Sequence, residues 1–527
     1  MTTPSAREKA ESFLVHASQF QLGELPTEAR HPKTKDLSGL AINDVTGAVG
    51  VFHEVELEAL QCLETEAAAI EELAAEIRST FAGGGRIIFC GCGATGRLSL
   101  SLETLWRERV NEMKRPELAD HVAGFIAGGD YAMVRSIENF EDHPEYGARQ
   151  LRDLAFSAKD LLISVTEGGE TPFVIGATEE GAQISTRKPW YLYCNPPGSL
   201  KVERSRRVLA NPRVRSLSLK TGPMAIAGST RLQASTALML AAGAALFAEL
   251  EAKSATDLVR EYRATLAATD FTGLAPLVVS ESKIYADGRH CVHRARHHAI
   301  TVLTDTTERS PTFSILPFEN PLIDSVQHLA WTYLSITDTA TAQQAWERIL
   351  HRRPRALDWH GFTEKYGPHV LPGFDFSRQS ELRREQEGGD LARFDIERSM
   401  AQVTLSIEGS TWSFTRPAWI VAEHLVLKCA LNITSTLVMG RLGRFKGNLM
   451  LYVKASNNKL VDRAIRFTRQ LLEDARIPVP SYEELCHALF EAAEGVGPED
   501  PVVLRTFELV KEKSRCSTGK SPSTASS

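Results

Sequence analysis

Apolar residues recur at helical spacing through residues 51–80, and this run predicts an amphipathic helix. The helical pattern ends at three glycines, Gly83 to Gly85, and glycine is a strong helix terminator. Residues 86–90 (RIIFC) then read as a short buried strand that runs directly into a glycine turn and an apolar helix. A strand, a tight turn and a helix in this order predict one βα unit of a parallel sheet.

The alternation of strand and helix continues along the chain. Strand-like runs are LLISV (161–165), WYLYC (190–194) and VRSLSL (214–219), and helical runs separate them. A long helix rich in Ala and Leu is predicted over about residues 229–252, and its dense apolar face indicates burial against another element. The pattern predicts a parallel, doubly wound sheet and hence an α/β fold.

A second α/β cycle follows the long helix. Residues 283–286 (KIYA) are predicted as a strand, followed by Asp287-Gly288 and a helical stretch, and residues 401–409 as a later strand. Residues 352–389 are charged and punctuated by Pro and Gly, which predicts a surface excursion. We therefore expect two doubly wound parallel-sheet domains, each a flavodoxin-like three-layer sandwich, and a helical C-terminal segment.

The same patterns divide the chain, with a junction between the two domains near residues 255–270. Residues 511–527 have the composition of a disordered segment. The predicted parts are a polar, turn-rich N-terminal extension (1–50), a first domain (51–255), a second domain (270–470), a small helical segment (471–510) and a disordered tail (511–527).

Composition and charge limit the classes of function. With 527 residues, 43% hydrophobic and 24% charged, the chain is an ordinary globular protein of two or three domains. A net charge of −6 argues against a general nucleic-acid coat. The sequence has no apolar run of roughly 18 residues, no signal-peptide core and no CxxC pair among its eight cysteines. We expect a cytoplasmic protein with reduced thiols.

The glycine turn at residues 91–97 (GCGATGR) is the first candidate for chemistry. Gly93 and Gly96 allow close approach of a ligand, and unpaired amides at the start of the next helix favour an anion. Thr95 offers a hydroxyl, and Arg97 offers a charge. The turn matches GxGxxG spacing, but no acidic ribose ligand follows about 20 residues on, and no Walker lysine ends it. A tight βα turn without a ligand stays an alternative.

Five ordered motifs resemble one known family. FCGCGATGRL resembles the first sugar-phosphate loop of N-acetylmuramic acid 6-phosphate etherases and of glucokinase regulatory protein, which are built from sugar-isomerase (SIS) domains. Four more segments are similar to family motifs: TEARHPKTKDL (27–37), FIAGGDYAMVRSIENFED (125–142), TGPMAIAGSTRLQASTA (221–237) and GRFKGNLMLYVKASNNKL (443–460). Together they are far more specific than one glycine loop, so the chain is identified as a member of this family.

The spacing of the last two motifs differs within the family. In the etherases they follow each other closely, whereas about 200 residues separate them here and carry the second α/β cycle. This resembles the regulatory protein, and DTTERSPTF (305–313) is similar to a segment of its second domain. The resemblance implies a pseudo-dimer of two SIS domains within one chain. Little sequence follows the last motif, so the known kinase partner of the regulatory protein is not carried over.

The resemblance implies a phosphate over the glycine turn and a second, hydroxyl-rich phosphate loop. In that second loop Ser164 and Thr166 supply hydroxyls, while Gly168 stands where the etherases have Ser. Glu167 and Glu170 are unusual there because like charges repel. We expect them to face sugar hydroxyls or a cationic amino sugar, with a surface loop as the alternative.

The resemblance also implies the groups that act on the sugar. Glu141 aligns with the catalytic base of the etherases, and a carboxylate can take a proton α to a carbonyl. Leu105 occupies the position of the family's acid, and Glu103 points about 200° around the helix from it. Glu308 matches a glutamate that the regulatory protein directs at the sugar, and Lys459 matches a lysine that reaches the ligand. Surface carboxylates and a solvated lysine are the alternatives.

Two departures and one histidine cluster complete the candidates. Met224 and Gln233 replace a family Glu and Lys, which removes two charges from the implied site. His293 and His297 have a spacing that binds zinc on a helix, but no HExxH accompanies them. We predict a basic, solvated helix start there, with an anion in the second domain as a further alternative. We expect neither a metal nor a cofactor.

Three functions stay open. The tandem architecture, Glu308 and the missing acid favour a sensor that binds a hexose or amino-sugar 6-phosphate and acts on a protein partner such as a sugar kinase. The alternatives are an etherase (a carbon–oxygen lyase) with Glu141 as base, and a phosphosugar isomerase. Neither nucleic acid nor a membrane is an expected partner. The sequence does not identify the sugar, the protein partner or the oligomeric state.

Overall fold

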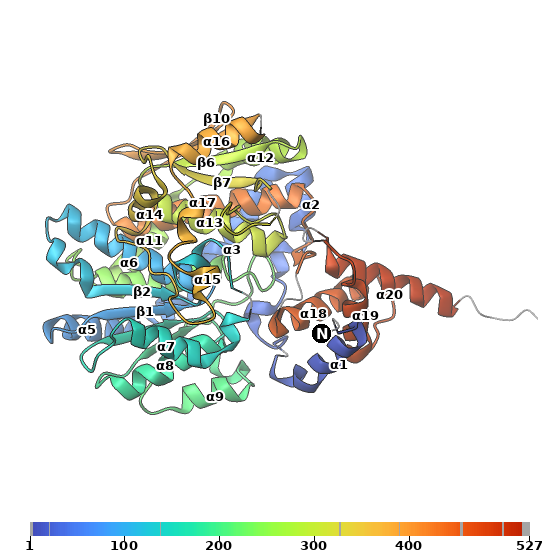
Figure 1. Ribbon diagram of the computed structural model, residues 1–527, viewed down its shortest axis with the longest axis horizontal. Coiled ribbons are helices and arrows are strands. Elements are labelled where there is room, and N and C mark those ends of the chain that lie inside the picture. The colour runs from blue at the N-terminus through green and yellow to red at the C-terminus, as the bar shows by residue number, and fades with distance from the viewer. Residues whose placement is uncertain are drawn as a thin grey trace, which may run out of the picture.

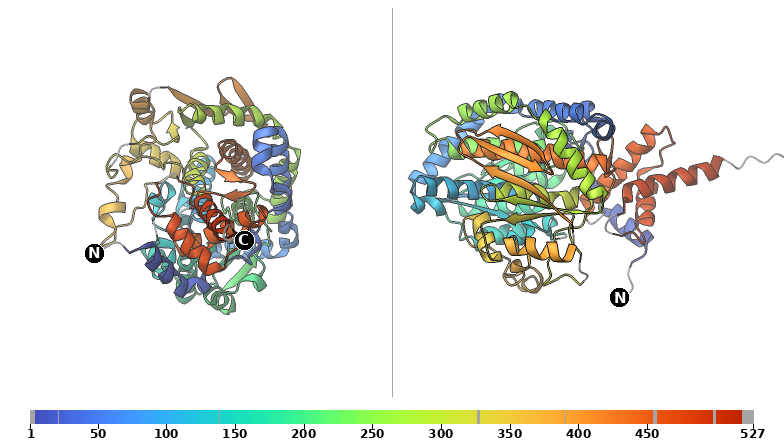
Figure 2. Two further views of the ribbon diagram at one scale, coloured as in Figure 1. Left: turned by 90° about the vertical axis from the view of Figure 1, so that its right-hand side faces the viewer. Right: turned by 90° about the horizontal axis from the view of Figure 1, so that it is seen from above.

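The chain forms two layered α/β units with a helical unit at one side (Figures 1 and 2). The predicted α/β fold class is confirmed: two five-stranded sheets and one two-stranded ribbon lie within the residues described below. The computed structural model describes residues 4–20, 22–137, 139–325, 328–388, 390–453, 457–497 and 500–518.

The first sheet is wholly parallel, with the order β2-β1-β3-β4-β5. The first four strands are buried along their whole length, as expected of a parallel sheet that helices cover on both faces. The chain places β2 on one side of β1 and β3 on the other, so the order reverses at β1. The strands are β1 (Ile87–Gly91), β2 (Val122–Ile126), β3 (Leu161–Val165), β4 (Trp190–Tyr193) and β5 (Arg215–Ser218).

Two groups of helices cover the first sheet, one on each face (Figure 1). One face carries α5 (Ala67–Ala82), α6 (Ala94–Glu112) and α10 (Gln233–Phe247); the other carries α7 (Pro144–Asp153), α8 (Pro172–Ile184) and α9 (Glu203–Ala210). The predicted helix over residues 51–80 is interrupted by turns, and the chain forms α3 (Val45–Ala59), α4 (Cys62–Thr65) and α5 instead. The interruption lets α3 pack against α17 while α5 packs against α10.

The second sheet is mixed, with the order β10-β9-β8-β6-β7. β6, β7 and β8 are parallel, as predicted, but β9 and β10 run antiparallel to their neighbours. The two-residue turn at Glu408 and Gly409 has positive φ at both positions, and such a turn joins antiparallel strands only. The strands are β6 (His290–Ala295), β7 (Thr332–Ile336), β8 (Leu391–Arg398), β9 (Gln402–Ile407) and β10 (Ser410–Thr415).

The start of the second cycle differs from the prediction. Residues 283–286 are the last turn of α12 (Ala275–Ala286), and the histidine-rich stretch after them is strand β6. A four-residue apolar run fits a buried helix as well as a strand, so periodicity alone does not separate the two. The other helices of this unit are α13 (Ala299–Phe313), α14 (Ala342–Leu350), α15 (Thr363–Tyr366) and α16 (Arg378–Gly388).

Part of the predicted surface excursion is buried against the first sheet's unit. Leu357 and Trp359 are 3% and 4% exposed and join the core on the α7–α8 face. The ring of Trp359 stacks on Phe140 with 5.8 Å between centroids, and its indole N–H donates to Asp153 at 2.7 Å. A loop from the second cycle therefore holds the segment that carries Glu141.

Two long helices lie between the sheets. α10 is buried over its whole length, and α17 (Ile420–Arg441) is buried from Ile420 to Gly440. By length and composition α17 would be able to cross a membrane, but its apolar stretch is buried inside the protein. α17 contacts α6, α10 and α13, which joins the two units. The predicted junction region forms α11 (Ala255–Ala268), which packs on α10.

Both ends of the chain are helical and meet. α1 (Ala6–His16) packs on α19 (Tyr482–Ala492), and α18 (Asn458–Asp474) and α20 (Val502–Thr518) complete this unit (Figure 1). α2 (Leu37–Asn43) packs beside the ribbon of β11 (Phe445–Lys446) and β12 (Leu449–Met450). The N-terminal extension is thus largely helical. α20 also includes residues 511–518 of the predicted tail, whereas residues 519–527 lie outside the described residues.

Short 3-10 helices lie in several of the connecting segments. They are η1 (Ala17–Gln19), η2 (Pro26–Glu28), η3 (Pro32–Thr34), η4 (Pro116–His121), η5 (Asp130–Met133), η6 (Phe140–Asp142), η7 (Pro197–Ser199), η8 (Thr272–Leu274) and η9 (Leu371–Gly373).

Candidate functional site

The glycine turn joins β1 to α6 at the carboxyl edge of the first sheet. A Cβ on Gly91 would lie 2.4 Å from the backbone carbon of Thr95, and Gly93 has a φ of +53°, so both positions require glycine. The hydroxyl of Thr95 donates to the carbonyl of Cys92 at 2.9 Å and accepts from the Cys92 amide at 3.1 Å. Thr95 thereby closes the turn.

The N-terminus of α6 presents hydrogen-bond donors. Its N-cap is Gly93, which has no side chain to cap the helix. Within the described part of the chain, the amides of Gly93 and Ala94 donate to no carbonyl or side chain. Unpaired amides and the helix dipole make this point attractive to an anion.

Arg97 and Glu308 link the two α/β units behind the turn. Arg97 is 2% exposed, and its Nε donates to the carbonyl of Met133 at 3.0 Å. Its Nη1 lies 3.9 Å from Oε1 of Glu308, which α13 positions. Burial raises the pKa of Glu308, although Arg97 and Arg231 act in the opposite direction. The Arg97 side chain therefore lies at the interface between the units and not at the front of the turn.

A small cavity lies beside Glu308, between α6, α10, α13 and α17. Its volume is about 20 Å³, which is room for about one water molecule. A hexose does not fit this space in the present conformation. The predicted contact between Glu308 and a sugar would require the units to separate, so it stays a prediction.

The loop after β3 brings the second set of predicted residues to the same edge. Ser164 lies within β3, is completely buried and accepts a hydrogen bond from Thr178 of α8 at 2.7 Å. The hydroxyls of Thr166 and Thr171 are 3.1 Å apart. The structure thus places Ser164 beneath α8, whereas Thr166 lies at the mouth of the loop.

Glu167 and Glu170 are buried carboxylates with incomplete pairing. Oε2 of Glu167 accepts from the Thr230 hydroxyl at 2.8 Å, whereas its Oε1 has no partner among the described residues. Oε1 of Glu170 also has no hydrogen bond there, and it lies 3.8 Å from Nζ of Lys459. Burial raises the pKa of Glu170 to about 7, although Lys459 and Arg204 lower it. The loop therefore holds a carboxyl that titrates near neutrality.

Glu141 lies in η6, and its side chain contacts both the glycine turn and the C-terminal segment. Its Oε1 accepts from the Asn457 side-chain amide at 2.9 Å, and its Oε2 accepts from Cys92 Sγ at 3.3 Å. Asn457 is also the N-cap of α18, and Lys459 lies in the first turn of that helix. Burial lowers the pKa of Lys459, but Glu170 and Glu167 outweigh it and raise the value. Glu141 and Lys459 thus meet at the same edge of the first sheet.

The remaining motifs form the base of this site. Thr27 donates its amide to Asn195 Oδ1 at 3.1 Å, and Gly228 donates its amide to the carbonyl of Thr27 at 3.1 Å. Glu28 is 1% exposed and accepts from Nε of Arg463 at 3.0 Å. Sequence reasoning did not single out these side chains, nor Thr230 and Asn457. The family motifs quoted above were the signal that would have identified them, because they contain all five residues: Thr27, Glu28, Gly228, Thr230 and Asn457.

The position to which the resemblance assigns the family's acid is apolar. Leu105 is completely buried, and Glu103 faces β2 instead of the turn. Burial would raise the pKa of Glu103, but Arg352 and Arg355 outweigh it and lower the value to about 2. Glu103 is therefore an ion-pair partner of the loop that carries Trp359, and it does not replace the missing acid.

The two residues that replace family charges have structural partners. Met224 is completely buried, and its sulfur accepts from the Ala234 amide at 3.1 Å. Gln233 donates to Glu56 at 2.8 Å and accepts from the Ala225 amide at 2.9 Å. Neither side chain adds a charge to the site.

Burial raises the pKa of Glu170, so we expect its replacement to change the stability of the protein. The pKa of a glutamate carboxyl is ordinarily 4.5, whereas that of Glu170 in the fold is about 7, so the folded state binds an extra proton between these pH values. Stability then falls as pH rises through this window. We expect Glu170→Gln to stabilise the protein by about 3 kcal/mol at pH 8 and by about 1 kcal/mol at pH 5.

Urea unfolding at the two pH values measures this difference. Glu203→Gln is a matched control, because the Glu203 side chain is 80% exposed and should leave stability unchanged at both. A Glu170→Gln protein that is no more stable than the parent at pH 8 would contradict a strained, buried carboxyl at this position.

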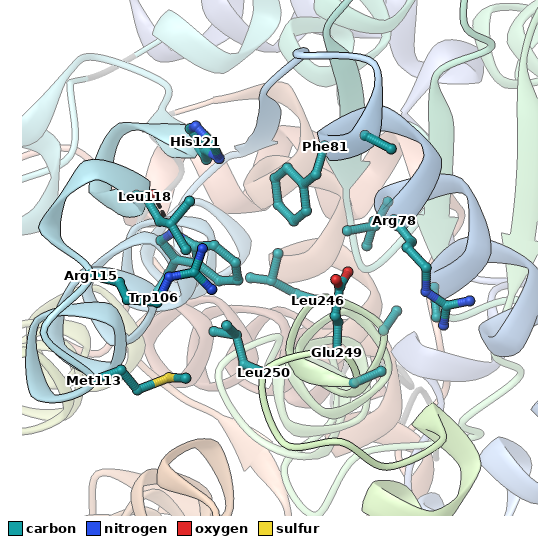
Figure 3. Close-up of a pocket in the computed structure, with 15 residues that line it drawn as sticks. Arg78, Phe81, Trp106, Met113, Arg115, Leu118, His121, Leu246, Glu249 and Leu250 are labelled. Atoms are coloured by element: carbon teal, nitrogen blue, oxygen red, sulfur yellow. Dashed lines mark hydrogen bonds between the residues drawn. The ribbon is translucent and has the colours of Figure 1, made fainter.

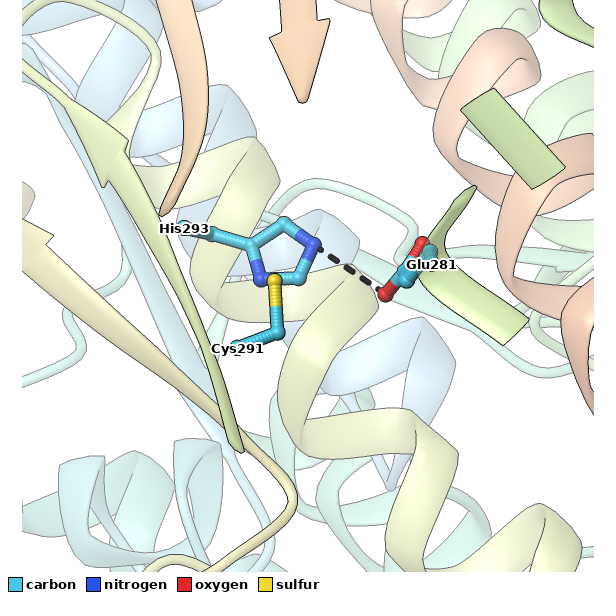
Figure 4. Close-up of side chains that lie close together, drawn as sticks. All are labelled: Glu281, Cys291 and His293. Carbon is cyan, nitrogen blue, oxygen red and sulfur yellow. Dashed lines mark ion pairs between the residues drawn. The ribbon is translucent and has the colours of Figure 1, made fainter. Parts of the chain in front are cut away.

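The histidine pair does not have the predicted helical geometry. His293 lies in strand β6 and is completely buried, so it and His297 do not share a helix face. Figure 4 shows His293 beside Cys291 and Glu281, with Nε2 of His293 3.6 Å from Oε1 of Glu281. The guanidinium of Arg309 lies between these groups and donates to Glu281. The cluster is an ion-pair network centred on Arg309, and the predicted solvated helix start is wrong at His293.

A cavity of about 430 Å³ lies at the other end of α6 (Figure 3). Phe81, Trp106 and Leu246 form its apolar wall, and the indole N–H of Trp106 donates to the carbonyl of Leu118 at 2.8 Å. Trp106 is eleven residues beyond Thr95, or roughly 16 Å along the helix. This cavity therefore does not belong to the site at the glycine turn.

Known proteins are similar to this chain in sequence, and solved structures can be aligned with it. The family model for the glucokinase regulatory protein N-terminal SIS domain matches residues 67–181. A solved tagatose-6-phosphate ketose/aldose isomerase from Escherichia coli aligns with a TM-score of 0.42 and 12% identity, covering 76% of this chain and 94% of that one.

Two curated relatives match over most of their own length. An N-acetylmuramic acid 6-phosphate etherase of Klebsiella aerogenes is 30% identical over 286 residues, which is 52% of this chain and 88% of the relative. N-acetylmuramic acid 6-phosphate etherase 1 of Vibrio cholerae is 30% identical over 288 residues, again 52% and 88%. By this similarity the chain belongs to the SIS-domain family of N-acetylmuramic acid 6-phosphate etherases.

Proposed function

We propose that this chain cleaves the lactyl ether of N-acetylmuramic acid 6-phosphate or of a related amino-sugar 6-phosphate. The observation that carries the proposal is Glu141, held at the rim of the glycine turn by Asn457 at 2.9 Å and Cys92 at 3.3 Å. The etherase relatives match over 88% of their length, whereas the regulatory-protein model covers residues 67–181. These comparisons favour an etherase over the sensor that the sequence alone favoured.

The glycine turn and Lys459 would bind the phosphate. The unpaired amides of Gly93 and Ala94 point from the start of α6, where an anion is stabilised. Lys459 adds a positive charge from the first turn of α18. The phosphate would compete with Glu170 for this lysine, because Nζ of Lys459 lies 3.8 Å from Oε1 of Glu170.

The chemistry needs one base close to C2 of the sugar. In the open-chain aldehyde, the proton on C2 is α to the C1 carbonyl and therefore acidic. Glu141 would take that proton, and the C3–O bond would break with its electron pair leaving on the lactate oxygen. Water then adds across the C2–C3 double bond, so one sugar phosphate and one water give an amino-sugar 6-phosphate and lactate.

The departing lactate oxygen needs a proton, and Leu105 has none to give. Glu170 is a carboxyl of the candidate site that keeps its proton up to about pH 7, because burial raises its pKa. A carboxylic acid whose pKa is close to the working pH is an effective proton donor. Glu141 and Glu170 would then act as base and acid on one sugar.

A sensor without turnover is the second candidate, and Leu105 is the observation that favours it. The side chain is apolar and completely buried at the position of the family's acid. The same groups would then bind a sugar phosphate and catalyse nothing.

Turnover of N-acetylmuramic acid 6-phosphate separates the two functions. We expect the full chain to release one lactate per sugar, and in D₂O to place one deuterium on C2 of the product. Unphosphorylated N-acetylmuramic acid is the control and should react far more slowly. A rise in melting temperature with the phosphorylated sugar but without lactate would favour the sensor. If the experiment shows no binding and no turnover, both proposals are wrong.

A further inference from the structure

The cavity at the far end of α6 has the size of a small-molecule site. The C-terminal halves of α5, α6 and α10 surround it, together with η4 (Figure 3). Its volume of about 430 Å³ is within the usual range of such pockets, which is about 300–1,000 Å³. The glycine turn lies at the other end of α6, so a molecule in this cavity would contact none of the residues of the candidate site.

The inner wall of the cavity is aromatic and firmly held. Trp106 and Leu246 are 3% and 1% exposed, and both belong to the core. The ring centroid of Phe81 lies 5.3 Å from that of Trp106 and 5.8 Å from that of His121, so the three rings form one row. Aromatic rings pack favourably on one another when they are offset or edge-to-face. This wall therefore suits a flat, aromatic group.

The outer wall leaves apolar side chains in contact with water. Leu118 and Leu250 are half-buried, and Met113 is 37% exposed. All three line the cavity. An apolar surface of this kind is typical of a binding site, because covering it removes apolar area from water. The apolar part of a ligand would therefore contact both walls.

Two unpaired charges of opposite sign lie at the mouth of the cavity. Arg78 and Glu249 line the cavity and are exposed. Within the part of the chain that the structure describes, neither side chain has a hydrogen bond or an ion pair. Arg115 is the second cation of the mouth, and its Nε lies 3.3 Å from Oε1 of Glu117. Figure 3 shows Arg78 and Arg115 on opposite sides of the cavity, with Glu249 between them in this view.

These charges define the polar part of a ligand. A guanidinium group binds a carboxylate through two parallel hydrogen bonds, and a carboxylate accepts hydrogen bonds from an ammonium group. A molecule with only a carboxylate would meet the like charge of Glu249, and one with only an amine would meet Arg78 and Arg115. An α-amino acid carries both groups on one carbon, next to its side chain. An aromatic side chain then matches the inner wall.

We propose that this cavity is a binding site for a free aromatic α-amino acid. The ring lies against Phe81 and Trp106, the carboxylate binds Arg78, and the ammonium group binds Glu249. Full affinity therefore requires the ring, the carboxylate and the ammonium group together. This inference does not depend on the etherase function, because none of these residues lies at the glycine turn.

Calorimetric titration of the full chain with four related compounds tests the proposal. L-Phenylalanine has the ring and both charges, 3-phenylpropionate lacks the ammonium group, phenethylamine lacks the carboxylate, and L-alanine lacks the ring. We expect one L-phenylalanine per chain with a dissociation constant of about 1 mM or below. Each of the two singly charged analogues should bind about fivefold more weakly, which is the usual size of one exposed ion pair. L-Alanine should show no binding.

Variants of exposed residues assign each contact. Arg78→Gln should remove the preference for L-phenylalanine over phenethylamine, and Glu249→Gln should remove the preference over 3-phenylpropionate. Ala82 is exposed at the end of α5 and lines the cavity, so Ala82→Trp should fill its mouth and abolish binding. Ala75→Trp is the matched control, because Ala75 is exposed on the same helix but does not line the cavity. This control should bind like the parent.

Three results would overturn the proposal. The first is L-phenylalanine that does not bind, or that binds no more tightly than the two singly charged analogues. The second is the parent affinity in Ala82→Trp, because the amino acid would then bind elsewhere. The third is loss of binding in Glu141→Gln, which would place the amino acid at the glycine turn. We expect Glu141→Gln to bind L-phenylalanine like the parent, and circular dichroism should show that each variant is folded.

Discussion

Replacing Glu141 by glutamine is expected to lower the rate of lactate release by a factor of about 10²–10⁴, which is the usual contribution of a general base. Glutamine has nearly the same shape, so it can keep a hydrogen bond to Asn457 or Cys92. It has no basic oxygen to take the C2 proton. We therefore expect kcat to fall while the affinity for the sugar phosphate changes little.

The measurement is initial lactate release at saturating sugar, together with incorporation of deuterium at C2. Glu145→Gln is the matched control: Glu145 lies four residues away, and its side chain is 63% exposed. This control should keep the parent rate. Exchange of the C2 proton that persists at the parent rate in Glu141→Gln would show that another group is the base.

Replacing Arg309 by methionine is expected to cost about 3–5 kcal/mol of stability, the usual effect of removing one member of a buried ion pair. Arg309 is completely buried, and its Nε donates to Asp305 Oδ2 at 3.0 Å while Nη1 donates to Glu281. Without the guanidinium, the Glu281 carboxylate keeps the Tyr285 hydroxyl at 2.8 Å but loses its buried cation. A buried carboxylate without a positive partner is costly.

A double variant separates the charge from the lost packing. Glu281→Gln removes the carboxylate, so the combination of Glu281→Gln and Arg309→Met should be more stable than Arg309→Met alone. Arg206→Met is the control, because the Arg206 side chain is 65% exposed and should change stability by less than about 0.5 kcal/mol. Urea unfolding measures all four proteins. A loss in Arg309→Met no larger than in the control would show that the network does not hold this unit together.

The two sheets explain why the site lies where it does. In the first sheet the order reverses at β1, and the glycine turn, the loop after β3 and Glu141 all lie at that edge. The N- and C-terminal segments close the site from outside, through Glu28 and α18. Residues far apart in the sequence thus share one surface because the ends of the chain pack on each other.

Local rules were sufficient for part of this fold. β1, β3, β4 and the glycine turn follow from short apolar runs that end at glycine or polar residues, since parallel strands are buried on both faces. They were not sufficient for residues 283–286, because a short apolar run is compatible with either a strand or a helix. The histidines of β6 were misplaced for the same reason. The antiparallel β9–β10 hairpin depends on a two-residue turn whose geometry the predicted strand did not reveal.

The sequence by itself determined the fold class and the family motifs, and by resemblance it predicts Leu105 at the position of the family's acid, because each depends on residue identity or local order. Only the tertiary structure decided which carboxylates lie at the candidate site. Glu103 and Glu170 look alike in the sequence, yet Glu103 pairs with three arginines while Glu170 is buried beside one lysine. Burial and charge partners set a pKa, and both come from segments that are distant in the chain.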